Sequence, residues 1–504
     1  MKTIKPTLIA SAIIAAQQSI AAVPVDTEAF RAAITLEGIR IHQLAFQEIA
    51  DANGGNRAAA TAGYDASLEY VSELVETAGY EVTVQPFDFP YFEELQAAEL
   101  EQLSPAPMVY GYFSNDGFAT MDYSGSGDVT ATAQAVDLQL PPGATANSST
   151  SGCEPEDFDS FTPGNIAVIQ RGSCSFVLKA GNAEAAGAAG VIILNEGQEG
   201  RTDAFLGTLS SPEVSIPVVG AAFDVGVELG AGDVTVRLLV DAISETRATS
   251  NLIAETPAGR DDRVVVIGAH LDSVAEGPGI NDNGSGSAAI LEMALQLAAS
   301  GVEPRNKVRF AWWGAEEAGL VGAQFYVDNL SKRDIKNIAL NLNFDMIGSP
   351  NYVRFVYDGD GSATGIAGPN GSANIEKVFE DYFASAGMPV EPTAFDGRSD
   401  YGPFIALGIP AGGLFTGAEG IKSEEEALVY GGTAGDQYDP CYHLACDTYD
   451  NNSDAGLSEM SGAAAHALYT FAMTTSAVNG TDKASDKAKK AAEEMEYQGN
   501  KLRR

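Results

Sequence analysis

Imidazole and carboxylate side chains follow several apolar, strand-like stretches of the sequence. In open sheets built from alternating strands and helices, functional groups gather beyond the carboxyl ends of the strands. Five separate segments therefore direct such side chains at one region. The residues are His270 and Asp272 after VVVIGA, Asp282 in GINDNGSG, Glu316 and Glu317 after FAWWGA, Asp345 in NLNFDM, and His443 in DPCYHLAC.

A cluster of this kind needs a cation, because several buried carboxylates cannot all stay ionised close together. Imidazole and carboxylate ligands suit zinc, with manganese or cobalt as possible substitutes. Two metal ions would require two ligand sets and one bridging carboxylate. A single acid at the end of a strand is more often a helix cap or a surface residue, so the prediction depends on the combined pattern.

The chain has only four histidines, and two of them, His270 and His443, belong to this set. His42 and His466 lie in amphipathic helical stretches. In such stretches a partly buried structural histidine is more common than a metal ligand. We therefore interpret these two as structural.

Hydrophobic periodicity predicts the elements that position these residues. RVVVIGAH, KVRFAWWG, NIALNLNFDM and PAGGLFTG have the pattern of buried strands, and SAAILEMALQLAAS between the first two has that of a helix. A helix in this place supplies the crossover that parallel pairing requires. We predict an α/β fold with a mixed, mostly parallel central sheet flanked by helices.

Residues 104–238 differ in sequence pattern from the segments on either side, because they contain short β-like runs separated by Gly, Pro and Ser. The run IAVIQRG, an Ala-rich helix and GVIILN resemble the protease-associated (PA) domain. This β-rich insert has no cluster of metal ligands, so we expect a lid or substrate-access role. Residues 23–103 and 239–478 would form one discontinuous catalytic domain, followed by a charged tail at 479–504.

The first 22 residues combine a lysine-bearing start, a short apolar run and small residues, which is typical of a secretory signal peptide. The apolar run is shorter than the roughly 20 residues that a bilayer requires, and no later segment supplies them. We therefore expect a secreted protein without a membrane anchor.

Export to an oxidising compartment favours disulfides, and four cysteines permit three pairings. We expect neighbours in sequence to pair, as Cys153 with Cys174 and Cys441 with Cys446. Alternatively, Cys441, His443 and Cys446 could form part of a structural zinc site, although only three ligands are local where four are needed.

The formal net charge of -40 excludes nucleic acid as a partner, because attraction to phosphates would become repulsion. So negative a chain also suggests a salty habitat, where counterions screen self-repulsion. No continuous EF-hand pattern supports a calcium site. We expect a monomer, although no residue pattern specifies the oligomeric state.

Several motifs together resemble the M28 family of dizinc aminopeptidases, in particular its secreted bacterial members. The resemblance covers about residues 56–103 and 250–478. Its most specific parts are GAHLDSV, GINDNGSGSAAILE, WWGAEEAGLVGAQFYV, LNFDMIGSPN, GRSDYGPFIALGIPAGGLFTGAEG and YDPCYHLACDTYDN.

The resemblance implies a role for each candidate residue. Asp282 would bridge two zinc ions, with His270 and Asp345 completing one site and Glu317 and His443 the other. Glu316 would be the general base and acid that takes a proton from the attacking water and gives it to the departing amine.

Four further positions follow from the same motifs. Asp272 would accept the free imidazole N–H of the ligand His270. Tyr442 would stabilise the oxyanion, and Arg398 would contact the substrate. Phe415 would line the pocket for an apolar N-terminal side chain. Tyr401 stands where the family often has a histidine that is not a metal ligand.

The resemblance implies a secreted enzyme that removes N-terminal residues from peptides. Three alternatives remain. A carboxypeptidase of the same superfamily would need more basic residues than Arg398 in its loops. A glutaminyl cyclase-like enzyme would use one metal ion. A non-catalytic PA-containing binding protein should have lost ligands or Glu316, which are all present here.

Overall fold

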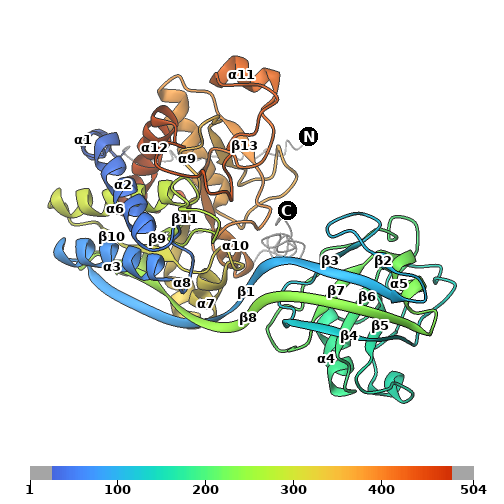
Figure 1. Ribbon diagram of the computed structural model, residues 1–504. Coiled ribbons are helices and arrows are strands. Elements are labelled where there is room, and N and C mark those ends of the chain that lie inside the picture. Colours follow the sequence, from blue (N-terminus) through green and yellow to red (C-terminus); the bar gives the residue numbers. More distant parts are fainter. Residues whose placement is uncertain (1–24, 479–504) are drawn as a thin grey trace, which may run out of the picture.

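Two bodies make up the part of the chain that the computed structural model describes, residues 25–478. The long strands β1 (Glu81–Ser104) and β8 (Val234–Glu255) pair with each other and join the bodies (Figure 1). The expected signal peptide and charged tail lie outside the described residues. Within residues 25–478, no helix combines the length and apolar character needed to cross a bilayer.

The larger body is built on a mixed sheet with the strand order β13-β12-β14-β11-β9-β10-β8. The four predicted strands are present as β9 (Arg260–His270), β10 (Asn306–Trp313), β11 (Ile338–Phe344) and β14 (Ala411–Phe415), and neighbours among them pair in parallel. Strand β12 (Phe355–Tyr357) is parallel to β13 (Glu391–Thr393) but antiparallel to β14, and β8 is antiparallel to β10. The predicted mixed, mostly parallel sheet is confirmed.

Helices cover both faces of this sheet. The larger hydrophobic core lies on the face that carries α2, α3, α6, α9 and α12, and a smaller core lies on the face that carries α7, α8 and α10. The bounds are α1 (Glu28–Ala33), α2 (Leu36–Ala52), α3 (Ala62–Thr77), α6 (Gly284–Ala299), α7 (Val321–Asp328), α8 (Lys332–Asn337), α9 (Ser372–Ser385), α10 (Tyr401–Ala406), α11 (Glu424–Tyr430) and α12 (Asp454–Met473).

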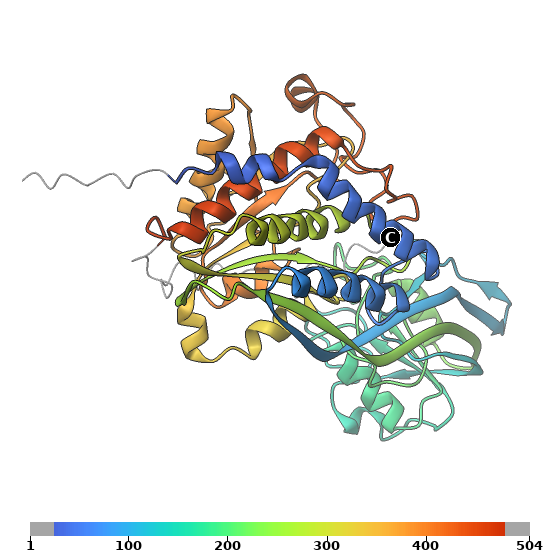
Figure 2. The ribbon, with the colours of Figure 1, turned by 90° about the vertical axis from the view of Figure 1, so that its left-hand side faces the viewer.

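Helix α6 is the predicted crossover between β9 and β10. Most of its residues are buried, because it lies between the sheet and the outer helices α1, α2 and α12 (Figure 2). The helix is apolar on nearly every side, which is typical of a helix that is covered all round. The residues at the N-terminus of α6 are therefore held with little freedom to move.

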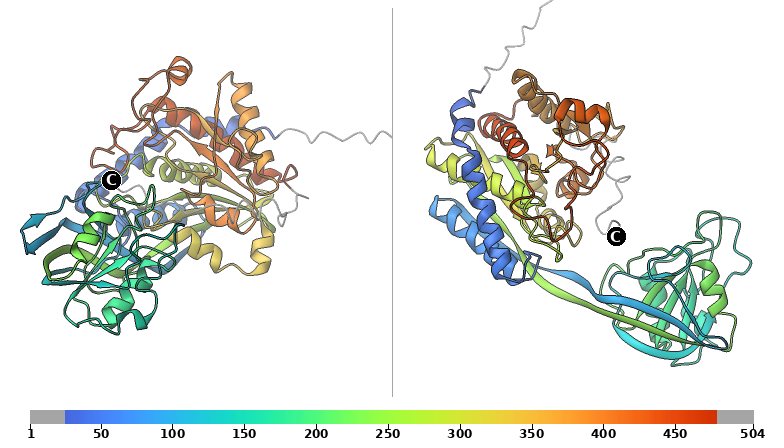
Figure 3. Two further views of the ribbon diagram at one scale, coloured as in Figure 1. Left: turned by 90° about the vertical axis from the view of Figure 1, so that its right-hand side faces the viewer. Right: turned by 45° about the horizontal axis from the view of Figure 1, so that its top comes forward.

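The smaller body contains the predicted unit of strand, Ala-rich helix and strand. Strands β4 (Gly127–Val136), β5 (Ile166–Gln170), β6 (Gly190–Leu194) and β7 (Val218–Ala221) pair in parallel, with α4 (Phe176–Ala185) between β5 and β6. The remaining elements are β2 (Met108–Val109), β3 (Phe118–Thr120), the 3-10 helix η1 (Pro155–Phe158) and α5 (Phe223–Leu229). Strands β1 and β8 run without a break from one body into the other (Figure 3).

Both expected disulfides are present. Cys153 pairs with Cys174, and Cys441 pairs with Cys446. The alternative of a zinc site at Cys441 and Cys446 is therefore wrong, because the sulfur atoms are bonded to each other.

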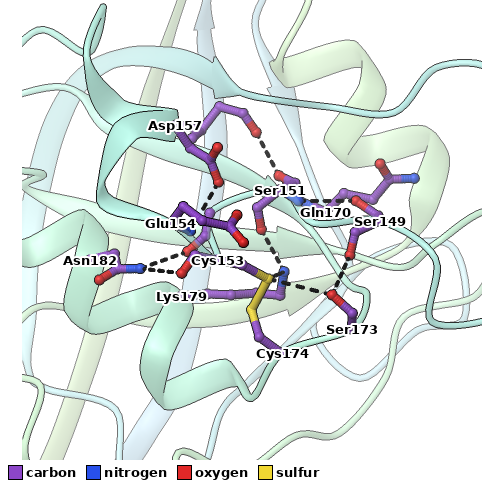
Figure 4. The surroundings of a disulfide bond; sticks show 12 residues. Ser149, Ser151, Cys153, Glu154, Asp157, Gln170, Ser173, Cys174, Lys179 and Asn182 are labelled. Carbon is purple, nitrogen blue, oxygen red and sulfur yellow. Dashed lines mark hydrogen bonds between the residues drawn. A yellow bond between two sulfur atoms is a disulfide. The ribbon is translucent and has the colours of Figure 1, made fainter.

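A buried lysine lies beside the first disulfide. Lys179 of α4 donates to the carbonyl oxygen of Ser151, and its Nζ lies 3.6 Å from Cys153 Sγ (Figure 4). The side chain is fully buried, and burial lowers the pKa of Lys179 to about 8. An ammonium group in this place ties helix α4 to the loop before β5.

Candidate metal centre

The candidate ligands meet at one edge of the sheet. His270 ends β9, Asp345 follows β11, Glu316 and Glu317 follow β10, and Asp282 precedes α6. Parallel strands bring their carboxyl ends to one edge, which is why residues up to about 170 positions apart become neighbours. Together they line a cavity of about 80 Å³, which contains His270, Asp282, Glu316, Glu317, Asp345 and His443.

Asp282 lies between the two histidines. Its Oδ1 is 3.2 Å from His270 Nε2, and its Oδ2 is 3.3 Å from His443 Nε2. The two oxygens of one carboxylate thus face different imidazoles.

Each histidine has a second carboxylate beside it. Asp345 Oδ1 lies 3.3 Å from His270 Nε2, and Glu317 Oε2 lies 3.2 Å from His443 Nε2. Glu316 Oε2 is farther away, at 4.0 Å from His270 Nε2. The donors therefore form two sets that share Asp282, with Glu316 beside the first set.

The electrostatics of the cavity favour a cation. Burial and the carboxylates of Asp400, Glu317 and Asp345 raise the pKa of Glu316 well above its ordinary value. Burial alone would lower the pKa of His443, but Glu317 and Asp282 raise it to about 10. The raised pKa values of Glu316 and His443 both reflect an excess of negative charge in the cavity, which a divalent cation would neutralise.

One donor atom points to the same conclusion. Glu317 Oε1 is buried and has no hydrogen-bond partner among residues 25–478. Buried polar atoms are normally paired, and an ion that binds in the site is one explanation for an exception. Imidazole nitrogen and carboxylate oxygen are the donors that zinc takes. The residues therefore fit a zinc site.

Asn283 places Asp282 relative to its neighbours. The Asn283 side-chain oxygen accepts from Gly286 N at the start of α6 and from Met346 N, while its amide donates to Phe344 O. The loop that carries Asp282 is thereby tied to the loop that carries Asp345.

Sequence reasoning did not identify Asp447 as a functional residue. The Asp447 carboxylate accepts from Asn281 N at 2.8 Å and from Asp282 N at 2.9 Å. It therefore holds the backbone at Asp282 in place. Asp447 lies in the motif YDPCYHLACDTYDN, but nothing in that motif distinguishes it from the other acids.

Asp272 is buried beside the ligands, yet its expected contact differs in detail. His270 Nδ1 donates to the backbone carbonyl of Asp272 at 3.0 Å, whereas the Asp272 carboxylate is 3.8 Å from that nitrogen. The carboxylate instead accepts from Glu316 N at 3.2 Å and Glu317 N at 3.3 Å. The turn after β10 leaves these two N–H groups without strand partners, and Asp272 satisfies them.

A buried arginine, which sequence reasoning also missed, supports the same loops. Arg57 is fully buried and donates to the carbonyl oxygens of Leu271, Pro278 and Gly279. Burial lowers the pKa of Arg57 to about 10, against the opposing influence of Asp272 and nearby acids. No local pattern around NGGNR indicates this role, because the partners are more than 200 residues away.

Ser399 and Asp400 lie behind Asp345. Ser399 Oγ donates to Asp345 Oδ2 and accepts from Asn343 Nδ2. Asp400 is buried, neither of its oxygens has a hydrogen-bond partner among the described residues, and burial raises its pKa well above the ordinary value. Both residues belong to the SDY motif, but only their neighbour Arg398 was a candidate from the sequence.

Tyr442, Arg398 and Phe415 line the same cavity as the candidate ligands. Tyr442 stacks on the His443 ring, with the ring centres 3.8 Å apart, and its hydroxyl accepts from Arg398 Nη2 at 3.2 Å. Arg398 also forms a two-pronged ion pair with Glu419, a residue that sequence reasoning did not single out. The charge of Arg398 is thus already paired.

His42 and His466 are distant from the cavity. His42 contacts the hydroxyl of Tyr70, and His466 contacts the hydroxyl of Thr27 and stacks on Tyr382. Both pack within the helical layer. Tyr401 donates to Asp396 and packs in a small aromatic cluster.

Comparison with known proteins gives a consistent result. The sequence profile of peptidase family M28 matches residues 251–468, and that of the PA domain matches residues 131–229.

An aminopeptidase of Pseudomonas aeruginosa is 51% identical over 438 residues, which are 86% of this chain and 80% of that protein. Leucine aminopeptidase 2 of Trichophyton rubrum is 45% identical over 326 residues, which are 64% of this chain and 65% of that protein. The solved structure of the aminopeptidase from Aneurinibacillus sp. strain AM-1 is similar with a TM-score of 0.64 at 26% identity, covering 91% of this chain and 99% of that one.

Proposed function

The chain belongs to peptidase family M28 and is an aminopeptidase, and on this premise we propose that it hydrolyses the N-terminal peptide bond of peptides with two zinc ions and Glu316 as the proton carrier. The observation that carries the proposal is the position of Asp282, whose two oxygens each face a different histidine. A carboxylate with this geometry suits a bridge between two cations.

Two ligand sets would hold the ions. His270 and Asp345 would complete the first set, Glu317 and His443 the second, and Asp282 would belong to both. When bound, such ions polarise a substrate carbonyl and lower the pKa of a water molecule, which manganese or cobalt could also do. Ser399 supports the first set, because its hydroxyl donates a hydrogen bond to Asp345 Oδ2, while Asp345 Oδ1 faces His270.

Glu316 would move the proton. Its carboxylate lies in the cavity at 4.0 Å from His270 Nε2, farther from the histidines than the carboxylates of the proposed ligands. It is therefore free to accept a proton from the attacking water at a carboxylate oxygen and to deliver it to the departing amine.

Tyr442 would stabilise the developing oxyanion. Arg398 Nη2 donates to the Tyr442 hydroxyl oxygen, so the hydroxyl proton remains available for the substrate carbonyl oxygen. Arg398 itself is held by Glu419 and would position Tyr442 and contact the substrate.

The N-terminal side chain would lie against Phe415. This ring lines the cavity, as do the apolar groups of Tyr357 and Met346. The proposed preference is therefore for apolar residues such as leucine or phenylalanine, and the name of the Trichophyton relative, leucine aminopeptidase, agrees with it.

We place the enzyme outside the cell. Support comes from the signal-like pattern of residues 1–22 and from two disulfides, since disulfides persist in oxidising compartments. The proposed state is a monomer.

A carboxypeptidase is less well supported. Its site would need a free cation for the terminal carboxylate, whereas Arg398 is already paired with Glu419. A cyclase that uses one metal ion would not need Asp282 between two histidines.

The test combines metal analysis with the order of amino-acid release. We expect about two zinc ions per chain, loss of leucyl-anilide hydrolysis after chelation, and release of residues from a defined peptide beginning at its amino end. Release beginning at the carboxyl end would contradict the proposal, and so would a single bound ion in the fully active enzyme.

A further inference from the structure

A second cavity, of about 470 Å³, adjoins the metal-ligand cavity. Its walls come from the loops after β9 and β10, from strand β1, and from the inserted domain. Glu317 lines both cavities, so the larger one begins at a candidate ligand. Its volume lies in the range of about 300 to 1,000 Å³ that is usual for ligand sites.

The inserted domain contributes Thr120 and Asp122 to the wall, together with large apolar side chains that are partly exposed. The Phe113 side chain is 54% exposed and Leu206 is 45% exposed, and both line the cavity. The Tyr112 ring packs edge-on against Phe113 with their centres 4.5 Å apart. Large apolar side chains left exposed around a hollow are typical of a binding surface.

The backbone at Phe113 supports this interpretation. Its φ is 54°, a left-handed conformation that a bulky residue rarely adopts, and a hydrogen bond from Phe113 N to Phe118 O at 2.9 Å holds it there. Such strain persists where the surrounding structure imposes it, and it is often found at ligand sites. The strain presents the ring to the cavity.

The small size of the metal-ligand cavity sets the direction of a bound peptide. At about 80 Å³ it has room for little more than the N-terminal residue, so the remaining residues must extend beyond it. The larger cavity adjoins it at Glu317.

Acidic groups at the larger cavity disfavour short substrate peptides. Asp272, Glu276 and Glu317 line it on one side, Glu93, Glu94 and Asp122 line it on the side of strand β1 and the inserted domain, and the whole chain carries a formal charge of -40. The terminal carboxylate of a dipeptide would lie among these acids and be repelled. In a peptide long enough to extend past the cavity, that carboxylate lies beyond them.

We propose that this cavity binds the residues that follow the scissile bond, and that Phe113 and Leu206 contact apolar side chains there. The substrates are thus oligopeptides rather than dipeptides, with apolar residues after the first. This inference rests on the proposed aminopeptidase function, because the residues that it places in the larger cavity belong to the peptide that is released after cleavage.

The experiment compares leucyl-p-nitroanilide, in which p-nitroaniline replaces the residues after the scissile bond, with an apolar tetrapeptide that begins with leucine. Phe113→Gly removes the ring at a position where glycine adopts the same φ without strain, and Leu206→Ser removes the second contact. Leu178→Ser is the control, since Leu178 is 46% exposed on the same domain but does not line the cavity.

We expect each cavity variant to lower kcat/KM for the tetrapeptide about tenfold, mainly through KM. Hydrolysis of the anilide should stay within about twofold of wild type, and the control should change neither rate. Equal losses on both substrates, or no loss on the tetrapeptide, would overturn the inference.

A further arm tests length in the wild-type enzyme. Leu-Phe-amide should be cleaved faster than Leu-Phe, because the amide has no terminal negative charge, and equal rates would overturn the length preference. Failure of the wild type to cleave leucyl-p-nitroanilide would instead refute the proposed function, so the two failures are distinguishable.

Discussion

Glu316 and Glu317 are adjacent in the chain, but their carboxylates face different histidines. Glu317 Oε2 lies 3.2 Å from His443 Nε2, whereas Glu316 Oε2 lies 4.0 Å from His270 Nε2. Asp272 makes this divergence possible, because its carboxylate accepts from the backbone N–H groups of both residues and fixes the turn. One acid can therefore serve as a ligand while its neighbour moves a proton.

Replacement of Glu316 tests this division of roles. Glu316→Ala and Glu316→Gln should each lower kcat for leucyl-anilide by about 10²-fold or more, since a general base is lost. The zinc content should not change, because the proposed ligand sets remain. Glu303→Gln, at an exposed position, is the matched control. Full activity in either Glu316 variant would refute its role as proton carrier.

Asp282 and Asp345 should differ in their effects on metal content. Asp282→Ala removes a carboxylate that faces both histidines, so both ions should bind more weakly. Asp345→Ala removes one that faces His270 alone, so one ion should be retained. Elemental analysis after gel filtration measures this, with Asp116→Ala at an exposed position as the control. Identical occupancy in the two variants would argue against Asp282 as a bridge.

The two disulfides should contribute differently to stability and activity. Cys441 and Cys446 are separated by 5 positions and enclose Tyr442 and His443, so the double serine variant should lose about 2 kcal/mol of stability. Its zinc affinity should also fall about 10- to 100-fold, because the support of a ligand is lost.

Cys153 and Cys174 are the matched comparison. They are separated by 21 positions, so their replacement by serine should cost about 3 kcal/mol through the longer loop. Because this disulfide is in the inserted domain, zinc affinity should stay unchanged. Denaturant titration and zinc titration of both variants separate the two effects, and a larger loss of zinc affinity in the second variant would contradict the assignment.

Lys179 should make the stability of the inserted domain dependent on pH. Its pKa is lowered from 10.5 to about 8 in the folded chain, because burial disfavours the charged form. Between these two values the unfolded chain binds more protons, so the free energy of unfolding rises with pH across this window. The whole rise corresponds to about 3 kcal/mol at roughly 1.4 kcal/mol per pKa unit.

Comparison with Lys179→Met isolates this contribution. The wild type should gain stability relative to the variant between pH 8 and pH 10.5, and the difference should be constant below pH 8. Lys377→Met, at an exposed position on α9, should show no such rise. Denaturant unfolding at a series of pH values measures the difference, and a constant difference for Lys179→Met would contradict the lowered pKa.

Local patterns in the amino-acid sequence were sufficient to predict the kind of fold and the candidate ligands. Strand and helix patterns are local, so VVVIGAH, the following apolar stretch of helical period and KVRFAWWG were sufficient to predict β9, α6 and the parallel pairing of β9 with β10. The carboxyl ends of parallel strands share one edge, so His270, Asp345 and Glu317 could be expected to meet there. Cysteine spacing was likewise sufficient to predict both disulfides.

The groups that hold those ligands in place could be identified only from the three-dimensional arrangement of the chain. The carboxylates of Asp272 and Asp447 accept from backbone N–H groups, and Arg57 donates to backbone carbonyls. Backbone groups are the same at every residue, so no sequence pattern marks these partners. The cavity between the two bodies depends in the same way on how distant segments meet in space, which local periodicity does not encode.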